Sequence, residues 1–87
     1  MALGVEGVRV GCWTHPEFPT GVTVVLPPAK AVGASAVRGG APGSREVDAL
    51  SPRGSVQECH GIVLTGGSAF GLATADGVVS WCEGEGL

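Results

Sequence analysis

The sequence has few basic residues. Its 87 residues include five lysines and arginines against eight acidic residues, which gives a formal net charge of −3. The five cations are scattered from Arg9 to Arg53 and form no stripe. A protein that binds nucleic acid needs clustered cations to neutralise phosphates, so this composition argues against a nucleic-acid partner.

Long apolar runs and paired metal-ligand motifs are also missing. No stretch approaches the length that crosses a bilayer, and the opening MALGVEGVRV lacks the basic start of a signal peptide. We therefore expect no membrane association and a cytoplasmic location. Cys12, Cys59 and Cys82 are an odd number of cysteines without a Cys-x-x-Cys pair. The expected state is reduced thiols, with neither a disulfide framework nor a metal site.

The chain is long enough for one small domain, and its organisation follows from glycine, proline and apolar patterning. Hydrophobic residues make up 44% of it, whereas Gly 16 and Pro 6 punctuate the sequence. β-branched residues predict strands over residues 8–13, 22–26 and 61–65. Residues 31–40 are predicted to form a further strand, third in a meander with the first two. Small residues at 33–36 would let another element pack closely on it.

A long loop and a helix complete the prediction. Residues 39–55 are rich in Gly, Pro, Ser and charge, which is typical of a functional loop. A helix is expected over residues 69–82, with Ser68 as its N-cap. Apolar residues recur on one side of this helix and suggest burial along much of its girth; they are Phe70, Leu72, Ala75, Val78, Val79, Trp81 and Cys82.

The turn Gly66-Gly67-Ser68 lies between the last strand and the helix, where phosphate-binding loops are often found. A phosphate loop needs a lysine directly after its second glycine, but Leu72 follows Gly71 here. The dinucleotide fingerprint fails because Ser68 stands in place of its second glycine. We therefore expect no nucleotide and no other cofactor.

The same turn begins like the nucleophile elbow Gly-x-Ser-x-Gly, but Phe70 occupies the position of the final glycine. This disfavours Ser68 as the nucleophile of an α/β-hydrolase without removing that alternative. Two other roles remain open. Ser68 caps the helix while Gly66 and Gly67 permit close packing or positive φ, or the turn contacts a substrate directly.

Two long motifs resemble those of a known family. RGGAPGSREVDAL at residues 38–50, followed by IVLTGGSAFGLATADGVVSW at residues 62–81, closely resembles the DmpA-type peptidases. These comprise L-aminopeptidase/D-esterase, the β-peptidyl aminopeptidases and, more distantly, nylon-oligomer endohydrolase. The segments GVRVGCWT and TGVTVVLPP are similar to the first two strands of that family, so the resemblance covers nearly the whole chain.

The resemblance implies an α+β fold, the N-terminal part of a four-layer αββα sandwich, with residues 1–87 as a single partial domain. It also implies a self-processing aminopeptidase or amidohydrolase. In such an enzyme a precursor cleaves itself before a Ser or Thr, and the freed residue attacks N-terminal aminoacyl amide, peptide or ester bonds. That nucleophile lies beyond the matched segment. The 87 residues are therefore predicted to hold no catalytic residue and to be inactive alone.

The resemblance further implies roles for particular residues and partners. Gly66, Gly67 and Ser68 would form a wall of the substrate site or supply backbone donors. The expected structural loop residues are Arg38, Gly39, Gly40, Arg45 and Glu46, which hold the loop or a subunit contact in place. Expected partners are a small peptide or aminoacyl substrate, the remainder of the α and β chains, and further copies in a homo-oligomer. The alternative is a stand-alone binding or interaction module that retains part of the fold.

Overall fold

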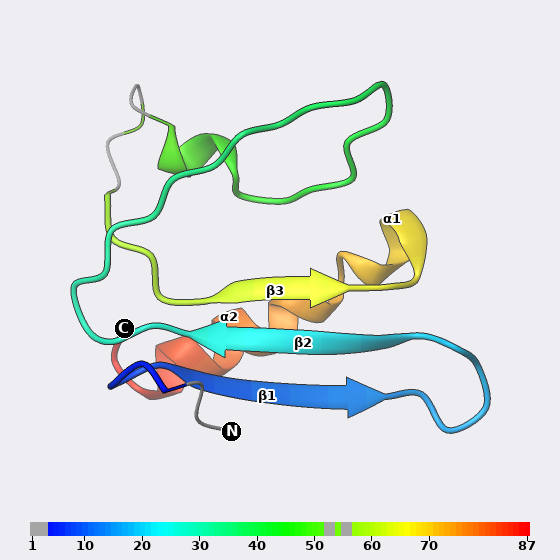
Figure 1. The fold of residues 1–87 in the computed structure, drawn as a ribbon, viewed down its shortest axis with the longest axis horizontal. Coiled ribbons are helices and arrows are strands. Elements are labelled where there is room, and N and C mark those ends of the chain that lie inside the picture. The colour runs from blue at the N-terminus through cyan, green and yellow to red at the C-terminus, as the bar shows by residue number, and fades with distance from the viewer. Residues whose placement is uncertain (1–3, 52–53, 55–56) are drawn as a thin grey trace.

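The structure, a computed structural model, describes residues 4–51, 54 and 57–87. Three strands, β1 (Arg9–Thr14), β2 (Gly21–Leu26) and β3 (Ile62–Thr65), form one antiparallel sheet in the order β1-β2-β3. The helices are η1 (Asp48–Leu50), α1 (Ser68–Gly71) and α2 (Thr74–Gly84). Figure 1 shows α2 behind the sheet and the long loop beyond the β3 edge. The predicted mixture of antiparallel strands with a C-terminal helical segment is confirmed.

The register of the sheet determines which side chains face α2. Val24 pairs with Val63, and Leu26 pairs with Arg9, so these side chains share one face. Arg9 lies over the ring of Trp81 in α2, with 5.6 Å from its guanidinium carbon to the ring centroid. Such a cation–π contact identifies the helix-covered face and ties β1 to the end of α2.

The opposite face of the sheet is bare in the described part of the chain. Strand alternation places Val25, Ile62 and Leu64 on this face, and Ile62 and Leu64 are 49% and 62% exposed. In Figure 1 it is the face toward the viewer. Among the described residues only Cys59 is a buried apolar side chain. No helix or strand of the described chain therefore covers this apolar side of the sheet.

The predicted strand over residues 31–40 is wrong. The structure has a single bridge there, between Val32 and Glu58, flanked by a hydrogen bond from the Cys59 N–H to the Ala31 carbonyl at 2.8 Å. Residues 31–38 and the described residues of 47–59 are thus the two limbs of one long loop between β2 and β3. These limbs pair with each other at the base of the loop rather than with the sheet. The prolines at 27 and 28 end β2, and the third strand of the meander is β3.

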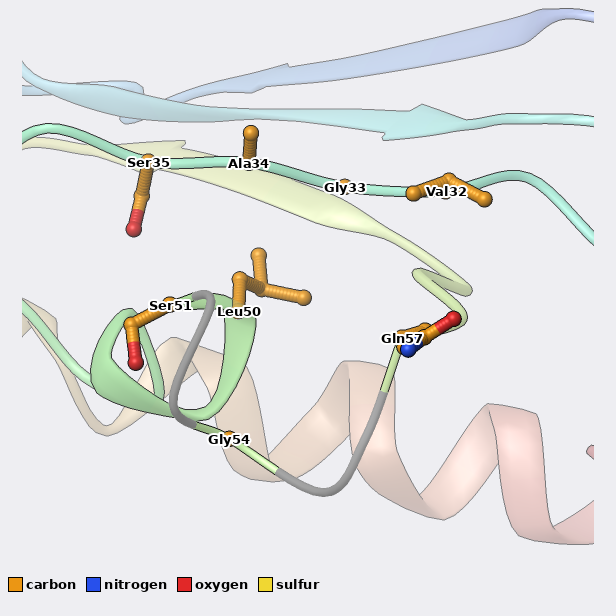
Figure 2. A pocket seen from close by; sticks show the side chains of 8 residues that line it. All are labelled: Val32, Gly33, Ala34, Ser35, Leu50, Ser51, Gly54 and Gln57. Carbon is orange, nitrogen blue, oxygen red and sulfur yellow. The ribbon is translucent and has the colours of Figure 1, made fainter.

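Close packing on the small residues of this limb is confirmed at Gly33. A Cβ at Gly33 would lie 2.9 Å from the Cys59 Cβ and 3.1 Å from a Leu50 methyl carbon. Figure 2 shows Leu50 pointing from η1 toward Gly33 and Ala34. A cavity of about 330 Å³ lies between the loop limbs at this point. Because Gly33 has no side chain, Cys59 and Leu50 can pack closely against its backbone inside the loop.

The helix predicted over residues 69–82 is divided into α1 and α2. The Thr74 hydroxyl donates a 2.8 Å hydrogen bond to the Gly71 carbonyl. The Ala75 N–H instead donates to the Leu72 carbonyl at 3.2 Å. A side chain that competes for a helical carbonyl tightens the turn at the junction.

Burial along much of the helix girth is also wrong. No residue of α2 is buried, Val79 is 55% exposed and Phe70 in α1 is 91% exposed. One side of α2 faces the sheet (Figure 1), and Arg45 of the loop contacts Asp76 in its first turn, while much of the remaining helix surface is exposed in the described chain. None of the helices in the described ranges has the length and apolar character needed to span a bilayer.

Candidate functional site

The strand-to-helix turn is built by backbone packed on backbone. The Gly66 N–H donates to the Gly21 carbonyl at 3.0 Å and so extends the β2–β3 pairing past the end of β3. A Cβ at Gly66 would collide with the Thr20 hydroxyl oxygen. The missing side chain at this position brings the turn directly against the β1–β2 hairpin.

Gly67 turns the chain into α1 with a left-handed conformation, φ 88° and ψ 12°. Its carbonyl accepts a 3.0 Å hydrogen bond from the Gly71 N–H, and a Cβ at Gly67 would lie 3.2 Å from the Gly71 Cα. Of the roles left open by the sequence, the positive φ and the close packing are both present here. An L side chain at Gly67 would meet strain in its backbone and crowding from Gly71.

Ser68 is not the helix N-cap. That position belongs to Gly67, and no side chain caps α1. Ser68 is the first helical residue and has a φ of 57°, whereas a capping serine needs extended backbone to reach the following N–H groups. Its hydroxyl forms no hydrogen bond with any described residue. A left-handed serine with an unpaired hydroxyl is a feature that helix capping does not explain.

Ser68 lies in a cleft of about 790 Å³ between the turn and the glycine-rich loop. The cleft is lined by uncharged residues from the loop, β3 and the start of the helices: Ala41, Pro42, Gly43, Ser44, Val63, Leu64, Thr65, Ser68, Ala69 and Leu72. Of the three residues predicted to contact substrate, the structure brings Ser68 to this cleft. Gly66 and Gly67 shape the turn behind it. The lining suits an apolar or neutral group rather than a charged one.

The described part of the chain provides no general base for Ser68. The His15 Nδ1 atom accepts hydrogen bonds from the N–H groups of Glu17 and Phe18, at 3.0 and 3.1 Å. The His60 Nε2 atom lies 3.6 Å from a Glu58 carboxylate oxygen. A serine nucleophile needs a base within hydrogen-bond reach, and Ser68 has none among these residues. No group of three metal-ligating side chains gathers within the described ranges either.

The loop predicted to be structural is tied to the rest of the chain at two points. Arg45 forms an ion pair with Asp76 in the first turn of α2, with 2.7 Å between the Arg45 guanidinium and the carboxylate. The Ser35 hydroxyl donates to the Val47 carbonyl at 2.8 Å, which joins the two limbs. Glu46, between these ties, has a φ of 65°.

The other predicted loop residues lie farther from these ties. Arg38, Gly39 and Gly40 are exposed, and Gly39 has a φ of 98°. Sequence reasoning singled out Arg45 but missed Asp76, its partner. No spacing rule connects a loop residue to a distant helix, so the sequence carries no local signal for this pair.

Comparisons with known proteins agree with one another. Residues 3–86 match the family model described as Peptidase family S58. A Mycobacterium leprae protein named an uncharacterized aminopeptidase is 57% identical over 91% of this chain and 24% of its own length. Similarly named proteins of Mycobacterium tuberculosis and Mycobacterium bovis are 49% identical over 91% of this chain and 25% of theirs. The chain thus spans about a quarter of the length of these relatives.

Proposed function

This chain belongs to peptidase family S58, and we propose that it forms the N-terminal part of a hydrolase that cleaves N-terminal aminoacyl amide, peptide or ester bonds. The observation that carries the proposal is the family match, which extends over residues 3–86. The relatives named as aminopeptidases support the same reaction class. The structure supports it with an uncharged cleft at the glycine turn.

In this proposal the segment supplies a wall of the substrate site, and the nucleophile comes from elsewhere in the enzyme. The lack of a base beside Ser68 in the described chain favours that division. The proposed nucleophile is a Ser or Thr that becomes a chain terminus by self-cleavage, and its own amine serves as the base. Ser68 and Ala69 would border the bound aminoacyl group opposite residues 41–44 of the loop.

The bare face of the sheet supports the proposed four-layer sandwich. A sheet whose apolar residues lie on both faces needs a second layer on each of them. Here α2 covers one face (Figure 1), and strand alternation places Val25, Ile62 and Leu64 on the other. We propose that a second sheet, formed by sequence outside these 87 residues, packs there. A homo-oligomer, with the long loop at a subunit contact, belongs to the same proposal.

The experiment uses the full-length protein that contains this segment. Purified protein is incubated with a panel of aminoacyl p-nitroanilides and small aminoacyl esters, and mass spectrometry of the intact protein follows self-cleavage. We expect release of p-nitroaniline and two product chains, the second beginning with Ser or Thr. Replacing that residue by Ala should abolish both events. An uncleaved protein that hydrolyses no substrate of the panel would refute the proposal and favour a binding module.

A further inference from the structure

The glycine-rich loop contributes one side of the cleft, and its position depends on few contacts. Residues 41–44 line the cleft opposite Ser68. Within the described chain, residues 36–46 form a single ion pair or hydrogen bond with a helix or strand, the contact between Arg45 and Asp76. Figure 1 shows the loop extending beyond the β3 edge, where no strand pairs with it. Residues 41–44, which line the cleft, are therefore followed directly in the sequence by Arg45, the residue that holds the loop to α2.

The geometry of the ion pair suits a positioning role better than a stabilising one. The side chains of Arg45 and Asp76 are 38% and 71% exposed. Exposed pairs add little to global stability because water competes for both charges. Asp76 lies in the first turn of α2, where a carboxylate is favoured by the helix dipole and where Arg45 can reach it. The contact thus connects a loop without regular secondary structure to a helix.

The backbone next to Arg45 indicates that the loop is held in place. Glu46 has a left-handed φ of 65°, which is unfavourable for a residue with a side chain. Such a conformation persists when contacts on both sides determine it. Here the ion pair of Arg45 lies on one side, and the hydrogen bond from the Ser35 hydroxyl to the Val47 carbonyl lies on the other.

We propose that Arg45 and Asp76 form a clasp that positions residues 41–44 against the cleft and thereby determines the affinity for the substrate's aminoacyl side chain. The effect of the clasp on substrate affinity rests on the proposed function, whereas its effect on the position of the loop does not. Because the cleft lining is uncharged, the group it holds is apolar or neutral. Arg45 and Asp76 are positioning residues, since neither lines the cleft itself.

The test compares variants of the full-length protein by two measurements. The variants are Arg45→Gln, Asp76→Asn and the charge swap Arg45→Asp/Asp76→Arg, with Arg38→Gln as the control. Arg38 lies in the same loop and has no ion pair within the described residues. Thermolysin, which cuts before aliphatic residues such as Val37 and Val47, reports opening of the loop. Hydrolysis of aminoacyl p-nitroanilides with apolar side chains reports KM and kcat separately.

We expect either single substitution to speed cleavage within residues 36–47 about two- to fivefold, the range typical of an exposed ion pair. The KM for apolar substrates should rise by a similar factor at nearly constant kcat. The charge swap should restore both values toward wild type, which a general loss of structure would not allow. Arg38→Gln should match wild type in both measurements.

The two measurements separate this proposal from the proposed function. If the wild-type protein hydrolyses none of the substrates, the proposed function fails while thermolysin still decides whether the clasp holds the loop. Equal cleavage rates in wild type and the Arg45→Gln variant would overturn the clasp. Faster cleavage with an unchanged KM would overturn its role in substrate affinity.

Discussion

Gly71 packs against the backbone of Gly66 so closely that a Cβ on Gly71 would collide with the Gly66 carbonyl oxygen and lie 2.9 Å from its carbon. Gly66 begins the strand-to-helix turn and Gly71 ends α1. The two backbones can approach this closely because neither residue has a side chain. This contact determines how α1 leaves the sheet, and with it the position of Ser68 at the cleft.

Gly71→Ala should destabilise the full-length protein by about 1–3 kcal/mol, because the methyl group forces the turn apart. Chemical denaturation measures the change. Gly77→Ala is the matched control, since a Cβ at Gly77 would meet nothing within 4 Å and the residue lies inside α2. That variant should be more stable than wild type by about 0.5–1 kcal/mol. Equal effects of the two substitutions would show that the Gly66–Gly71 contact has no special role.

Gly67→Val should impair folding or maturation of the full-length protein through backbone strain of about 1–3 kcal/mol. The φ of 88° at Gly67 is unfavourable for a β-branched residue, and the side chain would be crowded by Gly71, whose Cα would lie 3.2 Å from the Cβ. The yield of folded protein and the extent of self-cleavage are the measurements. A Gly67→Val variant that matures and functions like wild type would make Gly67 an ordinary loop residue.

Ser68→Ala in the full-length protein should retain hydrolytic activity within about tenfold of wild type, whereas loss of a nucleophilic serine lowers kcat by about a millionfold in a serine protease. The expectation follows from the free hydroxyl of Ser68 and the lack of a base beside it among the described residues. Steady-state kinetics with an aminoacyl ester measure it. A loss of activity as large as that of a nucleophile variant would restore the α/β-hydrolase alternative.

The isolated 87-residue chain should be molten or prone to aggregation and should bind the dye ANS strongly. Its described residues include one buried apolar side chain, whereas Leu64 and Phe70 are 62% and 91% exposed. The stabilisation from burying so little apolar surface is smaller than the free-energy cost of the conformational entropy lost on folding. Dispersed amide NMR signals together with a cooperative thermal transition would instead identify an autonomous domain.

The isolated chain should also hydrolyse no aminoacyl p-nitroanilide and should not cleave itself. In the proposed function the nucleophile lies outside these residues, and Ser68, which borders the cleft, has no base within the described chain to activate it. Release of p-nitroaniline is compared with that from a mock preparation, and intact mass reports cleavage. Turnover above the mock level would show that the segment carries a nucleophile of its own.

Local sequence alone determined the strands at residues 9–14, 21–26 and 62–65 to within a residue or two. Their β-branched runs end at glycine, proline or polar turns, which act within a few residues. The need for a special backbone at Gly67 is local for the same reason, because only glycine adopts positive φ without strain. The motifs that place the chain in its family are likewise contiguous stretches of sequence.

The tertiary structure decided the features that depend on distant partners. Residues 31–40 alternate like a strand, but their limb pairs at residues 57–59, so the sheet takes β3 as its third member. Ser68 has the residue type of an N-cap, but Gly67 takes the N-cap position and Ser68 has a positive φ of 57° as the first residue of α1. The pairing of Arg45 with Asp76 arises only when the loop folds back onto α2. Hydrophobic periodicity and residue type indicate the local preferences of the backbone. Which strands pair, which backbones crowd each other and which charges form ion pairs depend on the segments that the fold brings together.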